Sequence, residues 1–192
     1  MELEKAVEIF KETGVMLEGH FLLTSGRHSN RYMQCARLFE SAKHSEIMCA
    51  DLAARFAGER IDLVVGPALG GVIMSYEMSR QLGVRNFFAE RDNGTMTFRR
   101  GFAVQPGAQV LVVEDVVTTG GSVREVIDLV KQAGGEVVGV CSIVDRSAGK
   151  VDFSCRYEAV ASMEVLSWDA AECPLCAAGS PAVKPGSRAT GK

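Results

Sequence analysis

The sequence predicts an α/β fold, with a parallel sheet covered by helices on both faces. Short apolar runs alternate with segments whose apolar residues recur at helical spacing, which is typical of strand–helix–strand units. The chain has 192 residues, of which 47% are hydrophobic and 23% charged, so it is long enough to bury one full core. We therefore expect one domain with small appendages.

The order of the elements follows from these patterns. Helical periodicity, opened by a capping serine or closed by glycine, predicts helices at about 3–13, 41–57, 72–82 and 121–133. Short apolar runs predict strands at about 61–65, 87–91, 95–98, 110–113, 137–144 and 159–163. Asp92-Asn93-Gly94 separates the second and third of these strands. It predicts a tight hairpin, because Asn and Gly accept positive φ.

The composition changes after Trp168. The residues that follow are rich in Gly, Pro, Ala and Ser and include the pair Cys173 and Cys176. We expect residues 1–168 to form the domain and residues 169–192 a peripheral, partly disordered tail. The cysteine pair could be half of a zinc site or a redox pair. Because the sequence has no second C-x-x-C, reduced thiols are the favoured interpretation.

Charge and hydropathy exclude several classes of protein. A formal net charge of -3 provides no overall basic field for nucleic acid or an anionic membrane. No apolar run approaches the roughly 18 residues of a membrane span, and the first residues lack the pattern of a secretory signal. The six cysteines need no disulfide in a chain of this size. We expect a cytoplasmic protein with free thiols that binds neither nucleic acid nor a membrane.

Three loops are expected at the carboxyl ends of the predicted strands. They span residues 66–71, 114–122 and 145–147, and they contain glycines, hydroxyl side chains and charged groups. Ligands of doubly wound sheets bind at this edge. The three loops should therefore converge on one cleft.

The loop from Glu114 to Ser122 carries the most specific chemistry. Thr118-Thr-Gly-Gly-Ser122 precedes a predicted helix, whose first N–H groups and dipole favour a phosphate. No lysine follows as in a Walker loop, and no G-x-G-x-x-G occurs. Glu114 and Asp115 would repel a phosphate but could accept hydrogen bonds from sugar hydroxyls or help to hold Mg²⁺. The spacing indicates a phosphorylated sugar, with a plain capped strand-to-helix loop as the alternative.

The stretch VLVVEDVVTTGGS, from residue 110 to 122, resembles the phosphoribosyl diphosphate (PRPP) signature of type I phosphoribosyltransferases. Four further segments are similar, in this order, to the orotate phosphoribosyltransferases: GHFLLTSGRHSNRY (19–32), VVGPALGG (64–71), AERDNGTMTFRRGF (89–102) and VDRSAG (144–149). The resemblance covers residues 1 to about 165. It implies the type I phosphoribosyltransferase fold, with a small hood drawn from residues 1–40 and a β-hairpin. It also implies that orotate and PRPP give orotidine 5′-monophosphate and diphosphate, in pyrimidine biosynthesis.

The resemblance also implies site residues. PRPP would be bound by Glu114, Asp115, Val116, Val117, Thr118, Thr119, Gly120, Gly121 and Ser122. Candidates for binding the diphosphate or closing a lid are Ala68, Leu69, Gly70, Arg91, Arg99 and Arg100, and base-pocket candidates are Ser25, Gly26, Arg27, Tyr32 and Met33. Orotate would contact Thr118 and Arg146, whose guanidinium suits a carboxylate; the bland alternative for Arg146 is a surface pair with Asp145. Mg²⁺ would come with PRPP, near Glu114 and Asp115, without a dedicated protein cage.

The sequence departs from this family in two places. The hairpin DNGTMTFRRGF has none of the lysines and the histidine that many relatives carry in a longer lid, so Arg99 and Arg100 are the candidates for its charge. Thr24 stands where many relatives have lysine, which places more weight on Mg²⁺, Arg27 and Arg91. His28 is a candidate for a direct role, although a loop role is favoured. The resemblance further implies a homodimer.

Two other functions stay open at this point. One is transfer to another base, a purine or uracil, by a sister enzyme of the same fold. The other is a PRPP-sensing regulator without catalysis, which the acidic net charge and the lack of a basic stripe disfavour.

Overall fold

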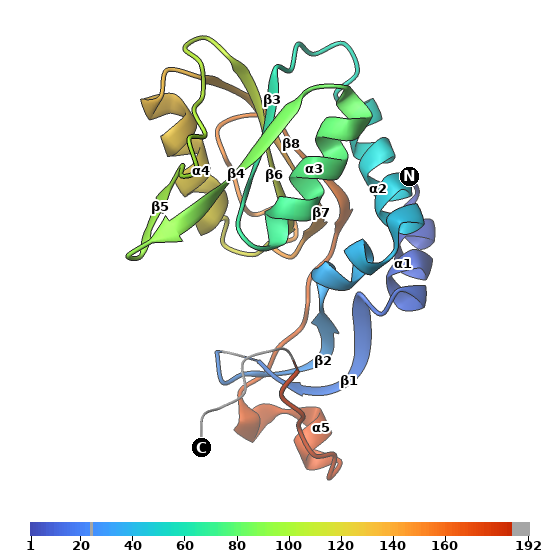
Figure 1. Cartoon of the computed structure of the whole chain (residues 1–192). Helices are drawn as coiled ribbons and strands as arrows, with labels where there is room; N and C mark the ends of the chain where they lie inside the picture. Colours follow the sequence, from blue (N-terminus) through green and yellow to red (C-terminus); the bar gives the residue numbers. More distant parts are fainter. Residues whose placement is uncertain (24, 186–192) are drawn as a thin grey trace.

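The centre of the molecule is a six-stranded sheet, seen in a computed structural model that describes residues 1–23 and 25–185. The strand order is β5-β4-β3-β6-β7-β8 (Figure 1). All neighbouring strands are parallel except the antiparallel pair β4–β5. The strands are β3 (Leu63–Pro67), β4 (Arg85–Asp92), β5 (Thr95–Thr97), β6 (Gln109–Val117), β7 (Glu136–Asp145) and β8 (Tyr157–Ser162).

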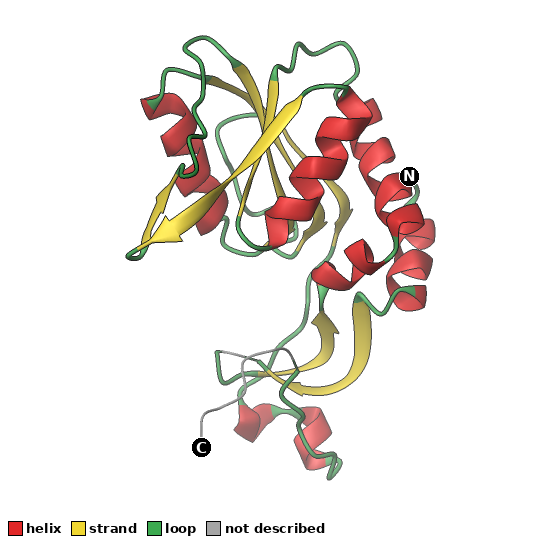
Figure 2. Cartoon of the chain, in the orientation of Figure 1, coloured by secondary structure: helices red, strands yellow, loops and turns green. Residues whose placement is uncertain are grey.

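Helices cover both faces of this sheet, as the sequence predicts (Figure 2). Helices α1, α2 and α3 share one face, and α4 covers the other. The helices of the domain are α1 (Leu3–Glu12), α2 (Ala42–Arg55), α3 (Gly70–Leu82) and α4 (Gly121–Gln132), with a 3₁₀ helix, η1 (Cys35–Glu40), before α2.

Alternation along the buried strands divides the core into two halves. Val64, Leu111 and Val113 point towards α2 and α3. Val65 and Val112 point to the other face, where they pack with α4. Successive side chains of a strand point to opposite faces, and a parallel sheet covered on both sides buries both sets. Because both faces of these strands are buried, their sequences are continuous apolar runs and do not alternate between apolar and polar residues.

The Asn93-Gly94 turn is confirmed. Both residues have positive φ, at 50° and 86°, and β4 pairs with β5 through Arg91 with Met96 and Asp92 with Thr95. Strand β6 is longer than the sequence predicts, because it continues through Glu114 and Asp115 to Val117. Pairing with β7 sustains the extension, since residue 116 is still in register with Val144. The two acids therefore lie within a strand and not after it.

Two strands are not predicted by the sequence. β1 (Met16–Leu22) and β2 (His28–Met33) form an antiparallel pair that lies apart from the large sheet, and we call this pair the hood hairpin (Figure 1). Among the described residues of 1–40, α1 packs into the core through Ala6, Ile9 and Phe10, and the hood hairpin contacts the core through Met16 and Met33. The hairpin has no simple alternation of apolar and polar residues, and buried histidines interrupt its pattern.

The expected peripheral tail is instead folded against the hood hairpin over its described part. It contains η2 (Ala170–Glu172) and α5 (Pro174–Ala177), and Figure 1 places α5 beside β1 and β2. Backbone hydrogen bonds join Trp168 to His28 in both directions, and Leu22 donates to the carbonyl of Val183 at 2.8 Å. The hood hairpin is thus stabilised by residues from the other end of the chain, which is why the local sequence pattern does not predict it. The expectation for residues 186–192 lies outside the described residues.

Within the described ranges, no helix is long and apolar enough to cross a membrane. All six cysteines lie within them and are unpaired.

Candidate active site

A polar cavity of about 210 Å³ lies where β6 passes into α4. It is lined by Arg91, Glu114, Val116, Val117, Thr118, Thr119, Gly120, Gly121, Ser122, Val123 and Glu125. All but one of the nine residues from Glu114 to Ser122 that the PRPP resemblance singles out are therefore brought to one cavity, and Asp115 adjoins it from the same strand. The cavity lies at the carboxyl edge of the sheet, where the sequence predicts the cleft.

The start of α4 is built to receive an anion. Gly120 is the N-cap, with φ 76°, and its missing side chain leaves the first N–H groups of the helix uncapped. A Cβ at Gly120 would also press against the ring of Phe153, 2.8 Å away. Thr118 and Thr119 are exposed on the loop before it and offer hydroxyl donors. Backbone N–H groups, hydroxyls and the helix dipole together favour a phosphate.

Glu114 and Asp115 are half-buried side by side next to this cavity. Their recorded hydrogen bonds are local: the amide of Asp115 donates to Glu114 at 3.2 Å, and the amide of Val116 donates to Asp115 at 2.8 Å. Burial, and then the charge of Asp115, raises the pKa of Glu114 from 4.5 to about 9. Burial also raises the pKa of Asp115. The pair is therefore suited to hydroxyl donors or a cation, which would favour its charged form.

The loop after β3 touches these acids. A Cβ on Gly70 would overlap the carboxylate of Asp115, so only glycine allows this approach of the α3 N-terminus. Ala68 donates to the carbonyl of Ala89 at 2.7 Å, which fixes the loop on β4. The peptide between Ala68 and Leu69 is cis, and Leu69 is exposed. Two of the three expected loops therefore meet at Asp115.

The third loop reaches the same edge through Arg146. Its amide donates to the carbonyl of Val117 at 2.8 Å, and its Nε is buried without a hydrogen-bond partner. Asp145 does not pair with it: that carboxylate accepts from the amides of Ser147 and Gly149, both at 2.8 Å. The surface ion pair that was the alternative for Arg146 is thus not formed. Part of this guanidinium remains available to a ligand.

The three charged groups lie around one buried thiol. Burial raises the pKa of Cys35, the charges of Asp115 and Glu114 raise it further, and the charge of Arg146 opposes them. All three charged groups are therefore close enough to Cys35 to influence the pKa of its thiol.

The arginines of the β4–β5 hairpin take different positions. Arg91 lines the cavity and binds Glu125 through two contacts of 2.9 Å. Arg99 and Arg100 lie outside the cavity lining, and Arg100 donates to Glu90 at 3.1 Å. Val123 and Glu125 are the two cavity residues that the sequence did not reveal. Glu125 lies one helical turn after Gly121, and only the approach of Arg91 from another strand brings it into the site.

The base-pocket candidates lie in or beside the hood hairpin and not in the cavity lining. Arg27 is bound to the other end of the chain, donating to Ser167 at 2.9 Å and to Asp169 at 3.0 Å. Tyr32 packs on Phe21, and Met33 is buried in the core. Ser25 and Gly26 are exposed, and Thr24 lies outside the described residues. His28 faces the tail and not the phosphate cavity.

This combination of a parallel sheet, two acids near the carboxyl end of a central strand and a polar cavity at a helix start has a family counterpart. The model of the phosphoribosyl transferase domain matches residues 37–170. The chain belongs to this family of phosphoribosyl transferases.

Relatives narrow the assignment. The orotate phosphoribosyltransferase of Pelotomaculum thermopropionicum is 58% identical over 188 residues, which cover 98% of this chain and 99% of the relative. The orotate phosphoribosyltransferase structure from Aeropyrum pernix is 26% identical and superposes with a TM-score of 0.66, over 81% of this chain and 92% of that one. Within the family, the chain thus belongs with the orotate phosphoribosyltransferases.

The fold alone would not distinguish the base. The adenine phosphoribosyltransferase structure from Rhodothermus marinus also superposes, with a TM-score of 0.65 at 19% identity, over 83% of this chain and 99% of that one. That likeness concerns the fold only.

The raised pKa of Glu114 gives a prediction for stability. A carboxyl whose pKa is higher in the folded than in the unfolded chain contributes stability below pH 4.5 that is lost as the pH rises towards 9. At pH 8, urea unfolding of Glu114→Gln should therefore give a free energy of unfolding at least about 1 kcal/mol higher than that of the native protein. This difference in stability should vanish near pH 4. Glu8→Gln, on the exposed face of α1, is the matched control. Identical pH profiles for Glu114→Gln and the native chain would contradict the desolvation of the acid pair.

Proposed function

We propose that the protein transfers the 5-phosphoribosyl group from PRPP to orotate, giving orotidine 5′-monophosphate and diphosphate in pyrimidine biosynthesis. The observation that carries the proposal is the phosphate cavity at residues 118–122 beside Glu114 and Asp115, in a chain 58% identical to an orotate phosphoribosyltransferase. The roles below follow from the chemistry of each group.

The 5′-phosphate of PRPP binds in the cavity. The uncapped amides at the start of α4 and the hydroxyls of Thr118, Thr119 and Ser122 donate to its oxygens. Glu114 and Asp115 accept hydrogen bonds from the ribose hydroxyls. These bonds favour the charged form of both acids, so ligand binding lowers their pKa.

The diphosphate lies over the loop of Ala68, Leu69 and Gly70, which reaches Asp115. The acid pair fits Mg²⁺ as well as hydroxyls, because its carboxylates are oxygen ligands without a positive protein partner in their recorded contacts. Mg²⁺ bound with PRPP near these acids would neutralise charge on the diphosphate as it departs. Arg91 adds positive charge on the cavity side, and Arg99 and Arg100 are the nearby lid candidates once released from Glu90.

Orotate is bound at the other end of the ribose. The free Nε of Arg146 and the hydroxyl of Thr118 can donate to the carboxylate and ring oxygens of this anion. Among the hood candidates, the exposed Ser25 and Gly26 are the residues that would complete the base pocket. Arg27 and Tyr32 are held by other contacts, and Met33 is buried in the core.

The chain needs no nucleophile of its own for this reaction. Orotate attacks the anomeric carbon, positive charge develops on the ribose, and negative charge develops on the leaving diphosphate. The protein contributes position and electrostatic stabilisation. The carboxyl end of β6 is well suited to this task, because a strand paired on both sides in the sheet holds the two acids at fixed positions.

We further propose a cytoplasmic homodimer. Leu69, Ile73 and Tyr76 are 88%, 53% and 62% exposed and follow one another at helical spacing along α3, which leaves an apolar stripe next to the active site. A second copy of the chain would cover this stripe. Sedimentation equilibrium, which measures the mass of the particle in solution, would then give twice the mass of one chain. Six unpaired cysteines accord with a reducing compartment.

Base selectivity is the direct test of this function. With PRPP and Mg²⁺, orotate should be consumed and orotidine 5′-monophosphate formed, whereas adenine, xanthine and uracil should give no comparable turnover. Equal or faster turnover of a purine or uracil would move the protein to a sister activity of the same fold.

Arg146→Ala tests the base end of the site. Loss of a charged hydrogen-bond donor should raise KM for orotate by about 10- to 100-fold and leave KM for PRPP nearly unchanged. Arg60→Ala is the matched control, because Arg60 is 76% exposed and lies before β3, at the opposite edge of the sheet. Equal increases in both KM values would show that Arg146 supports the fold of the site and not orotate alone.

A further inference from the structure

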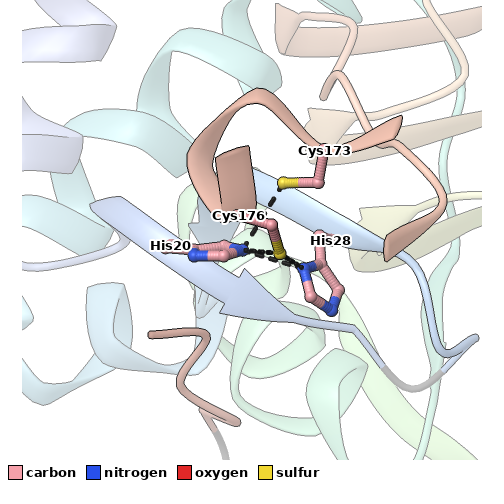
Figure 3. Close-up of side chains that lie close together, drawn as sticks. All are labelled: His20, His28, Cys173 and Cys176. Atoms are coloured by element: carbon pink, nitrogen blue, oxygen red, sulfur yellow. Dashed lines mark hydrogen bonds between the residues drawn. The ribbon is translucent and has the colours of Figure 1, made fainter. Parts of the chain in front are cut away.

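Four potential metal ligands converge in the hood, away from the active-site cavity. His20 comes from β1, His28 from β2, and Cys173 and Cys176 from the tail around α5 (Figure 3). One ligand atom of each lies within 4.8 Å of all the others. No residue of this group lines the phosphate cavity.

The distances between the ligand atoms are short. The His20 Nε2 and the His28 Nδ1 are 2.8 Å apart, and the Cys176 Sγ lies 3.2 Å from the same His28 nitrogen. The sulfurs of Cys173 and Cys176 lie 3.5 and 3.7 Å from the His20 Nε2. In Figure 3 the two rings and the two sulfurs point towards one another.

Hydrogen bonds within the protein cannot satisfy this arrangement. The His20 Nδ1 lies 2.8 Å from the carbonyl of Ser180, an acceptor, so Nδ1 carries the proton and a neutral ring keeps a lone pair at Nε2. That single lone pair faces one ring nitrogen and two sulfurs. It can accept from one of them, whereas one cation at the centre would bind all four ligand atoms.

We propose that His20, His28, Cys173 and Cys176 form a structural zinc site. Two thiolates and two imidazoles are a common donor set of tetrahedral Zn²⁺. From zinc bond lengths, an N and an S ligand should be about 3.6 Å apart and two N ligands about 3.3 Å. Three S–N distances, of 3.2 to 3.7 Å, are close to the first value. The two nitrogens need to separate by about half an ångström, and the ligand atoms that lie farthest apart, within 4.8 Å, need to approach each other.

The surroundings favour a structural site over a catalytic one. His20, His28 and Cys173 are buried, at 6%, 9% and 2% exposure, and the four ligands leave no open position for a substrate. The carbonyl of Ser180 orients the His20 ring, as outer partners of zinc-bound histidines do. The ion would join both strands of the hood hairpin to the tail. The proposal departs from the interpretation of Cys173 and Cys176 as plain reduced thiols, because His20 and His28 take the place of the missing second cysteine pair.

Metal analysis of the full-length protein, purified without chelators from cells supplied with zinc, is the test. One zinc per chain is expected. Replacement by Co²⁺ should give the visible ligand-field bands of a tetrahedral site together with sulfur-to-cobalt charge transfer. Cys176→Ser should bind Zn²⁺ more than about tenfold more weakly, as measured by competition with a chromogenic chelator. Cys155→Ser is the matched control and should keep its zinc, because Cys155 is partly exposed and packs against the core on the α4 side of the large sheet.

Two outcomes would overturn the proposal. One is native protein that holds no zinc and gives no tetrahedral Co²⁺ spectrum after reconstitution. The other is a Cys173–Cys176 disulfide, detected by mass spectrometry in the native protein, with zinc binding unaffected by Cys176→Ser. If Cys176→Ser does not fold, the metal content, the Co²⁺ spectrum and the disulfide analysis of the native protein still test the proposal.

Discussion

Two like charges that share a half-buried strand end are the constraint on which this site depends. Glu114 and Asp115 cannot both be comfortably ionised without a ligand, as the raised pKa of each indicates. Groups that could relieve this cost surround them: the helix start at Gly121, the loop at Gly70 and the guanidinium of Arg146. Hydrogen-bond donors such as sugar hydroxyls, or a divalent cation, would stabilise the charged forms of the two acids.

Strand β6 serves the core and the site at once. Its first half, through Val113, is fully buried between the two layers of helices, and its second half forms the wall of the cavity. Pairing with β7 continues to Val117, so the acids have the rigidity of the sheet. Where catalysis rests on position and electrostatics, this continuity matters more than any single reactive group.

Much of the fold could be predicted from the sequence because its signals are local. Apolar runs and helical stripes located the strands of the large sheet and α1 to α4, and the loop before α4 was predicted as a site from residues that line one polar cavity. The hood hairpin could not be predicted in this way, since the buried His20 and His28 contact partners about 150 residues further along the chain. The orientations of Arg99, Arg100 and Glu125 likewise depend on contacts between elements. Of the four proposed zinc ligands, Cys173 and Cys176 form a recognisable pair in the sequence, whereas His20 and His28 do not.

The hood also constrains the order in which the molecule can form during synthesis. Strands β1 and β2 are made early, but Ser180, which holds the ring of His20, follows 160 residues later. At the usual rate of translation that interval is about 8 to 32 s. During this interval the segments that form the core around β6 are synthesised and can pack, while β1 and β2 lack their partners from the tail. Assembly of the hood is thus a late event, in which the two ends of the described chain close on each other.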